Sequence, residues 1–119
     1  MKLVNMMNTN DPFVVYLNQF SPPIKIRLAK IYAIFEKAFP EAQFIFSYQM
    51  PTFKKKKNLV HFAAYTNHIG IYPGPQGIQV LLDTYPQIKT SKGTWLIPHD
   101  QTLPIQILLH LCQWIQTQA

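Results

Sequence analysis

A β-hairpin in the middle of the sequence constrains the fold of this chain more than any other feature. Residues 59–73 are rich in β-branched and aromatic side chains, and the polar pair Thr66-Asn67 interrupts them. Asn tolerates a positive φ angle, so this pair predicts a tight two-residue turn between two strands. The turn fixes a register in which three pairs of residues face each other: Tyr65 with His68, Ala63 with Gly70, and His61 with Tyr72.

That register gives the hairpin two unlike faces, because side chains alternate along a strand. The second face has a floor of two small residues, Ala63 and Gly70, between aromatic and imidazole side chains. It is either a half-solvated sheet surface, which is the commoner case, or a shallow binding groove. The first face is apolar and is predicted to lie in the core: Val60, Phe62, Ala64, Ile69 and Ile71.

The two histidines of the hairpin suggest that they could bind one metal ion together, but the predicted register argues against this. His61 lies four residues from Tyr65, the predicted partner of His68. At ~3.3 Å per residue the two rings are about 13 Å apart, whereas a metal ion needs its ligand atoms at about 2 Å. One chain therefore cannot hold a single ion between this pair.

The flanking sequence predicts helices around the hairpin. At 119 residues the chain has room for one domain, and its 48% hydrophobic content can fill a core. We expect residues 1–10 to be a flexible leader and residues 11–119 to form the domain. Apolar side chains at helical spacing predict two long helices, over residues 21–39 and 102–118, and shorter helices from Asp11-Pro12 and over residues 78–85.

The remaining strands complete an antiparallel sheet. We predict a single α+β domain with about four to five strands. Both long helices are expected to pack on the face that carries Phe62, Ile69 and Ile71. The additional strands are predicted over residues 44–48, 53–55 and 94–97, with Met50-Pro51 interrupting the pairing and residues 87–92 forming a surface loop.

The last predicted helix is apolar on two sides. Besides the face that points to the core, Ile107, Leu111 and Trp114 form a second apolar face. A helix this widely apolar either lies deep in the fold or meets another subunit. We therefore expect self-association as a homodimer through these three side chains.

The residue types favour a protein without enzymatic activity. The one cysteine, Cys112, falls on the apolar side of the last helix, where a thiol usually acts as a small hydrophobe. The sequence has few carboxylates and none of the common His or Cys spacings of metal sites. It also has no apolar run near the ~20 residues of a membrane span, so we expect a cytoplasmic protein that makes no membrane contact.

The net charge of +6 comes from a shortage of acids, of which the chain has five. The run from Lys54 to Lys57 falls at a predicted hairpin tip, where lysines ordinarily hinder edge-to-edge association of sheets. A phosphate-facing patch is the alternative interpretation. Because no recognised nucleic-acid-binding motif accompanies the lysines, binding of nucleic acid is the less favoured hypothesis.

A series of short motifs resembles a known family. The motifs, in order, are Tyr48-Gln-Met-Pro-Thr-Phe53, Phe62-Ala-Ala64, His68-Ile-Gly-Ile-Tyr-Pro73, Ser91-Lys-Gly-Thr94, and Pro98 followed by Leu103-Pro104. Together they resemble the YdhG-like family of small bacterial proteins, a domain of unknown function. One branch of that family is described as a frataxin-like iron chaperone. The resemblance thus implies a frataxin-like sandwich, iron as the bound metal, and iron–sulfur assembly or other iron-using proteins as partners.

Iron ligands under this resemblance would come from the few acids and one histidine. A hard metal ion prefers carboxylate oxygen, to which an imidazole can add a nitrogen. Phe44 stands where family members often carry a glutamate. The candidate iron ligands are Glu36, Glu41, His68 and Asp83.

The alternative function is a module that binds a small molecule or a protein partner on the second face of the hairpin. Its aromatic walls suit an apolar or planar ligand, and His68 and Lys92 would hold an anionic group. A protein partner could use the same surface. The candidate ligand-binding residues are Tyr48, Met50, Pro51, Phe53, His61, Tyr65, His68, Tyr72 and Lys92.

Overall fold

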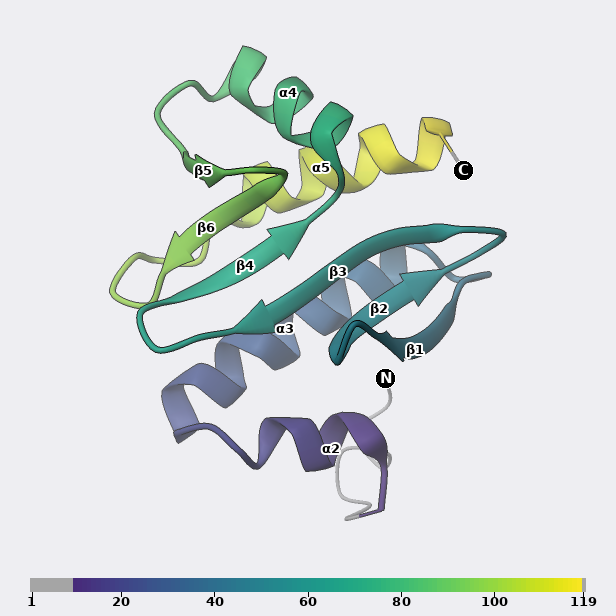
Figure 1. The fold of residues 1–119 in the computed structure, drawn as a ribbon, viewed down its shortest axis with the longest axis vertical. Coiled ribbons are helices and arrows are strands. Elements are labelled where there is room, and N and C mark those ends of the chain that lie inside the picture. Colours follow the sequence, from purple (N-terminus) through teal and green to yellow (C-terminus); the bar gives the residue numbers. More distant parts are fainter. Residues whose placement is uncertain (1–9, 119) are drawn as a thin grey trace.

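Six antiparallel strands form one sheet in the computed structural model, which describes residues 10–118. Their order across the sheet is β1-β2-β3-β4-β6-β5 (Figure 1). The α+β class is confirmed, and the sheet has six strands rather than four or five. The strands are β1 (Gln43–Ser47), β2 (Met50–Lys54), β3 (Asn58–Ala64), β4 (His68–Tyr72), β5 (Lys89–Ser91) and β6 (Thr94–Pro98).

The β3–β4 hairpin has the predicted register. Tyr65 N donates to His68 O at 2.8 Å, and Ala63 faces Gly70 and His61 faces Tyr72 as expected. Phe62, Ile69 and Ile71 are fully buried. The apolar face of the hairpin is therefore the centre of the core, as the alternation predicted.

Two predictions about the strands were wrong. β5 forms in the segment expected to be a loop, where it pairs with β6 across the Lys92-Gly93 turn. The sequence did not reveal this strand because its three residues are polar and show no apolar alternation. β2 lies between β1 and β3 and runs through Pro51 instead of being interrupted there. Pro51 is tolerated because β2 pairs with β3 only from Thr52 onward, so no ladder bond needs the N–H that proline lacks.

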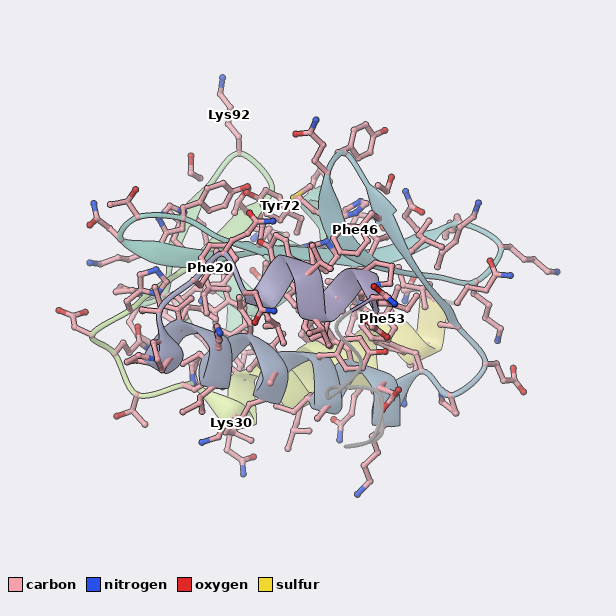
Figure 2. The ribbon with its side chains drawn as sticks, turned by 90° about the horizontal axis from the view of Figure 1, so that it is seen from below. Phe20, Lys30, Phe46, Phe53, Tyr72 and Lys92 are labelled. Carbon is pink, nitrogen blue, oxygen red and sulfur yellow. The ribbon has the colours of Figure 1, made fainter. Side chains whose placement is uncertain are left out.

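Four helices accompany the sheet in the part of the chain that the structure describes. α3 and α5 lie below the sheet in Figure 2, on the side opposite Tyr72 and Lys92, which confirms the predicted layering. Arg27 donates to Pro98 O at 3.0 Å near the start of both helices, and Gln116 donates to Ala38 O at 2.8 Å near their ends. The two long helices thus run side by side in the same direction. The helices are α2 (Pro12–Leu17), α3 (Pro22–Ala38), α4 (Pro75–Thr84) and α5 (Ile105–Gln118).

The short helix α2 closes the core at the β1 side. Asp11 caps it by accepting from Phe13 N at 2.8 Å. The ring of Phe13 stacks on Tyr32 with centroids 4.6 Å apart. The hydroxyl of Tyr16 accepts a bond from Ala64 N at 3.0 Å, at the end of β3, so α2 satisfies a backbone donor of the sheet as well as burying rings.

α4 begins at Pro75, earlier than the helix expected over residues 78–85, and covers the second apolar face of α5. Leu111 is fully buried, and Ile107 and Trp114 are half-buried. Trp114 packs so tightly against α4 that a Cβ at Gly77 would lie 3.1 Å from its ring. The breadth of the apolar surface on α5 therefore has an explanation within one chain. The homodimer through these three residues stays a prediction.

The turn between β1 and β2 is strained. Tyr48 and Gln49 both have positive φ angles, 53° and 62°. These are the two central positions of a type I′ hairpin turn, which asparagine and glycine ordinarily occupy. The left-handed region costs a residue with a Cβ roughly 1–2 kcal/mol of conformational energy. Glycine at these positions would not carry this cost.

We expect Gln49→Gly to stabilise the protein. Relief of the left-handed strain, roughly 1–2 kcal/mol, outweighs the ~0.5–1 kcal/mol entropy cost of glycine, and the central values leave a gain of about 0.75 kcal/mol. Urea unfolding measures the change as a higher midpoint. Gln49→Ala keeps the Cβ and is the matched control, for which no gain is expected. A Gln49→Gly variant no more stable than the alanine variant would show that the turn is unstrained.

Candidate functional site: the open face of the sheet

The face of the sheet opposite α3 and α5 carries the side chains of the predicted binding site. Register places His61 of β3 between Thr52 of β2 and Tyr72 of β4. Tyr72 and Lys92 lie on the side of the sheet that α3 and α5 leave uncovered (Figure 2). We call this surface the open face, defined by Tyr48, Met50, His61, Tyr65, His68 and Tyr72.

The small floor of the hairpin is covered rather than empty. The ring of Tyr72 leans along its own strand, and a Cβ at Gly70 would lie 3.0 Å from the Tyr72 hydroxyl. The Tyr72 and Tyr65 hydroxyls meet at 2.8 Å. Ala63 and Gly70 are buried beneath these rings. The open face is therefore a surface of aromatic rings without a deep groove.

The two tyrosine hydroxyls form an ordered chain of donors. Tyr65 Oη donates to Met50 Sδ at 3.9 Å, so the proton between the two hydroxyls comes from Tyr72. Burial, followed by this hydrogen bond, raises the pKa of Tyr72 above its ordinary value of 10.0. Tyr72 is thus a neutral donor that fixes the position of Tyr65.

His61 is held in one tautomer by Thr52. Thr52 is fully buried and donates its single hydroxyl proton to Met50 O at 2.9 Å. Its oxygen lies 2.7 Å from His61 Nδ1, so Nδ1 must carry the proton of that bond. Desolvation lowers the pKa of His61 below its ordinary value of 6.5. At neutral pH His61 is therefore uncharged, and Nε2 presents a free lone pair.

The strained turn displays Tyr48 beside this histidine. Tyr48 is 80% exposed, more than any other large hydrophobic side chain in the described residues. Its ring meets the His61 ring edge to face, with centroids 5.7 Å apart. On the other side of the open face, the rings of Tyr65 and His68 lie 5.1 Å apart. The strained turn at residues 48 and 49 thus places an aromatic ring in solvent.

Two shallow hollows flank His68, with volumes of about 480 and 570 Å³. The larger is lined by residues that the sequence did not single out, Lys89, His99 and Asp100. His99 lies close because its Nε2 donates to Tyr65 O at 2.7 Å. The pairing of β4 with β6 brings these residues in, and no local sequence pattern reveals that pairing.

Two of the predicted ligand-binding residues face the other way. Phe53 is 2% exposed and packs on Tyr32 and Phe35 in the core. Pro51 has the same parity along β2 and is also buried. Their inclusion in the site was wrong, because β2 pairs continuously and alternation turns both toward the helices. Lys92 extends from the β5–β6 turn into solvent on the open side (Figure 2).

The candidate iron ligands lie on separate elements. Glu41 pairs with Lys55 at 3.2 Å, and Asp83 of α4 accepts from Gln79 at 2.8 Å. Glu36 belongs to α3 and His68 to β4. Across residues 10–118, no three His, Cys, Asp or Glu side chains come together in a way that could hold a metal ion.

Cys112 has the inert environment that its place in the sequence suggested. It is 3% exposed, and burial raises the pKa of its thiol to about 12. A protonated, enclosed thiol is neither a nucleophile nor a metal ligand at neutral pH. Along the same described part of the chain, no helix is long and apolar enough to cross a membrane.

Solved structures share this fold. No family model and no curated protein matches the sequence. The crystal structure of YdhG from Bacillus subtilis, a DUF1801-family protein, is similar with a TM-score of 0.81 over 91% of this chain and 90% of that one, at 15% identity. An uncharacterized conserved protein from Lactobacillus casei is similar with a TM-score of 0.57 over 88% and 89% of the chains, at 18% identity. Neither supports the frataxin-like part of the resemblance. The chain has the fold of DUF1801-family proteins, as its motifs predicted.

Proposed function

We propose that this chain is a non-enzymatic binding module that recognises a protein partner through the open face. The observation that carries the proposal is the strained turn that holds Tyr48 in solvent beside His61. Strained backbone persists where the surrounding structure enforces it, and it gathers at functional sites. An exposed ring displayed at such a cost is best explained by contact with another molecule.

The shape of the open face favours a protein over a small molecule. Small-molecule sites are concave and enclose most of their ligand. Here the Tyr72 ring covers the floor, and the hollows beside it are shallow. Tyrosine and methionine are enriched at protein interfaces, where large rings bury area at low entropy cost. The open face has this composition, with Tyr48 and Tyr65 as its exposed rings.

The chemistry of the open face defines the partner. The Nε2 lone pair of His61 accepts a hydrogen bond and adds no charge at neutral pH. Lys89 lines the hollow beside His68, and Lys92 stands above the same side of the sheet (Figure 2). A complementary surface would offer an apolar or aromatic anchor for the rings, a donor for His61 and an acidic rim.

The iron role implied by the resemblance ranks second. It needs several oxygen ligands around one ion, and the described residues do not bring Glu36, Glu41, Asp83 and His68 together. The open face instead offers hydroxyls and imidazoles and no carboxylate. Binding of a partner is therefore the function that the geometry supports better.

Photo-cross-linking from the open face tests the proposal. Tyr48 and Tyr65 are replaced, one at a time, by benzoylphenylalanine in the cells that produce the protein, and adducts are identified by mass spectrometry. We expect the same partner at both positions. Purified, that partner should bind the wild-type chain, and Tyr48→Ala should raise the Kd at least tenfold, or about 1.4 kcal/mol.

Ile26 supplies the matched control for the cross-linking, because it is 57% exposed on α3, on the opposite side of the molecule. An adduct formed equally well from position 26 would indicate nonspecific contact. A cross-linked protein whose affinity is unchanged by Tyr48→Ala would contradict the proposed function.

The tautomer of His61 is a second test of the site. Long-range ¹H–¹⁵N correlation spectra at pH 7.5 should show the proton on Nδ1, because Thr52 can only accept in this bond. The titration midpoint should lie below 6.5, the ordinary pKa of the group, because desolvation disfavours the charged ring. Thr52→Val should release the ring to a mixture of tautomers, and His68 in the same spectra is the internal control. A proton on Nε2 in the wild type would remove the acceptor from the proposed surface.

A further inference from the structure

A second concave surface lies at the tip of the β2–β3 hairpin, away from the open face. Three hollows of about 470, 350 and 150 Å³ adjoin there. They share residues: Leu59 lines all three, Lys57 and Gln118 line two, and Lys55 lines two. In Figure 1 the hairpin tip lies at the same end of the molecule as the C-terminal end of α5. We call this surface the tip groove.

A β-bulge forms the floor of the tip groove. Phe53 pairs with Val60 and Lys54 pairs with Asn58, so Leu59 is the extra residue between two consecutive pairs. A bulge re-aims the side chain of the extra residue. Leu59 therefore joins Val60 on the helix side and is 8% exposed. The groove has an apolar base because the strand pairing is irregular at this one position.

Apolar side chains continue the floor toward α4. The largest hollow is lined by Trp114 and Ile115 of α5 and by Pro73 and Pro75 at the end of β4 and the start of α4. Trp114 is half-buried with its ring against Gly77. One apolar side chain of a bound segment would fit here.

Lysines form the rim of the tip groove. Lys55, Lys56 and Lys57 are exposed around the hollows. Lys55 pairs with Glu41 at 3.2 Å, whereas within residues 10–118 neither Lys56 nor Lys57 forms an ion pair with a carboxylate. Of the described residues, Glu41 is the one acid that lines any of the three hollows. Among the described residues, the positive charge of this rim is compensated only at Lys55.

We propose that the tip groove binds an acidic peptide segment of a partner protein, with an apolar side chain over Leu59 and Trp114 and carboxylates against Lys56 and Lys57. Three hollows in succession suit an extended chain more than a compact ligand. Nucleic acid would need rings that stand free for bases to stack on, and Trp114 is packed against α4 instead. The proposal stands apart from the function of the open face, because the two surfaces share no residue.

The probe is a fluorescein-labelled peptide of twelve residues with aspartate and glutamate at most positions and one central tryptophan. Fluorescence anisotropy at low ionic strength should show saturable binding. Amide resonances of Leu59 and Gly74 and the indole resonance of Trp114 should shift. Lys56→Glu/Lys57→Glu should weaken binding at least tenfold. The matched control is Lys25→Glu/Lys30→Glu, which makes the same charge change on α3 and should weaken binding less than threefold.

Two further probes separate the alternatives. A peptide with serine in place of the tryptophan should bind at least fivefold more weakly, and equal affinity would reduce the site to surface charge and overturn the proposal. A twelve-nucleotide single-stranded DNA that binds more tightly, with the same dependence on Lys56 and Lys57, would make nucleic acid the occupant and also overturn it. Tyr48→Ala should leave peptide binding unchanged, so failure here is distinguishable from failure of the open-face proposal.

Discussion

The register of the β3–β4 hairpin is the constraint on which the rest of the structure depends. A slip of β4 by one residue against β3 would exchange the two faces of β4, moving Ile69 and Ile71 into solvent and His68 and Tyr72 into the core. The Thr66-Asn67 turn fixes this register locally. Tyr16 then adds a long-range restraint, because its hydroxyl accepts from Ala64 N directly before the turn. The core and the open face are thus two results of one pairing.

Local patterns account for what the sequence predicted correctly. The strands of the hairpin, the long helices and their common side of the sheet follow from strand alternation and helical periodicity, which neighbouring residues determine. The positive φ angle expected at Asn67 does not occur, although the register is the predicted one. The errors share a different cause. β5 is short and polar, and Pro51 is tolerated because of where its nitrogen points. Each depends on the strand alongside, and that neighbour cannot be read from a local pattern.

The candidate site was predictable in its residue types and not in its shape. Alternation placed His61, Tyr65, His68 and Tyr72 on one face, which the structure shows. It could not show that the Tyr72 ring would lean over Gly70 and close the floor, because a rotamer decides that. Lys89 and His99 were missed because β6 inserts beside β4 only after a helix and a further strand. A groove for a small ligand became a ring-covered surface for this reason.

Met50 connects the strained turn to the open face. It is the first residue of β2 after Tyr48 and Gln49, and its two acceptors are both used: the carbonyl by Thr52 and the sulfur, more weakly, by Tyr65. Thr52 in turn orients His61, and Tyr72 orients Tyr65. A strained conformation persists only when its surroundings determine it several times over. The hydrogen bonds to Met50, directly after the turn, therefore belong to the same network that sets the tautomer of His61 and the position of Tyr65. The strained turn and the proposed binding surface are thus connected through Met50. A partner that contacts Tyr48, as proposed, would meet a surface that is already ordered, at little further entropy cost.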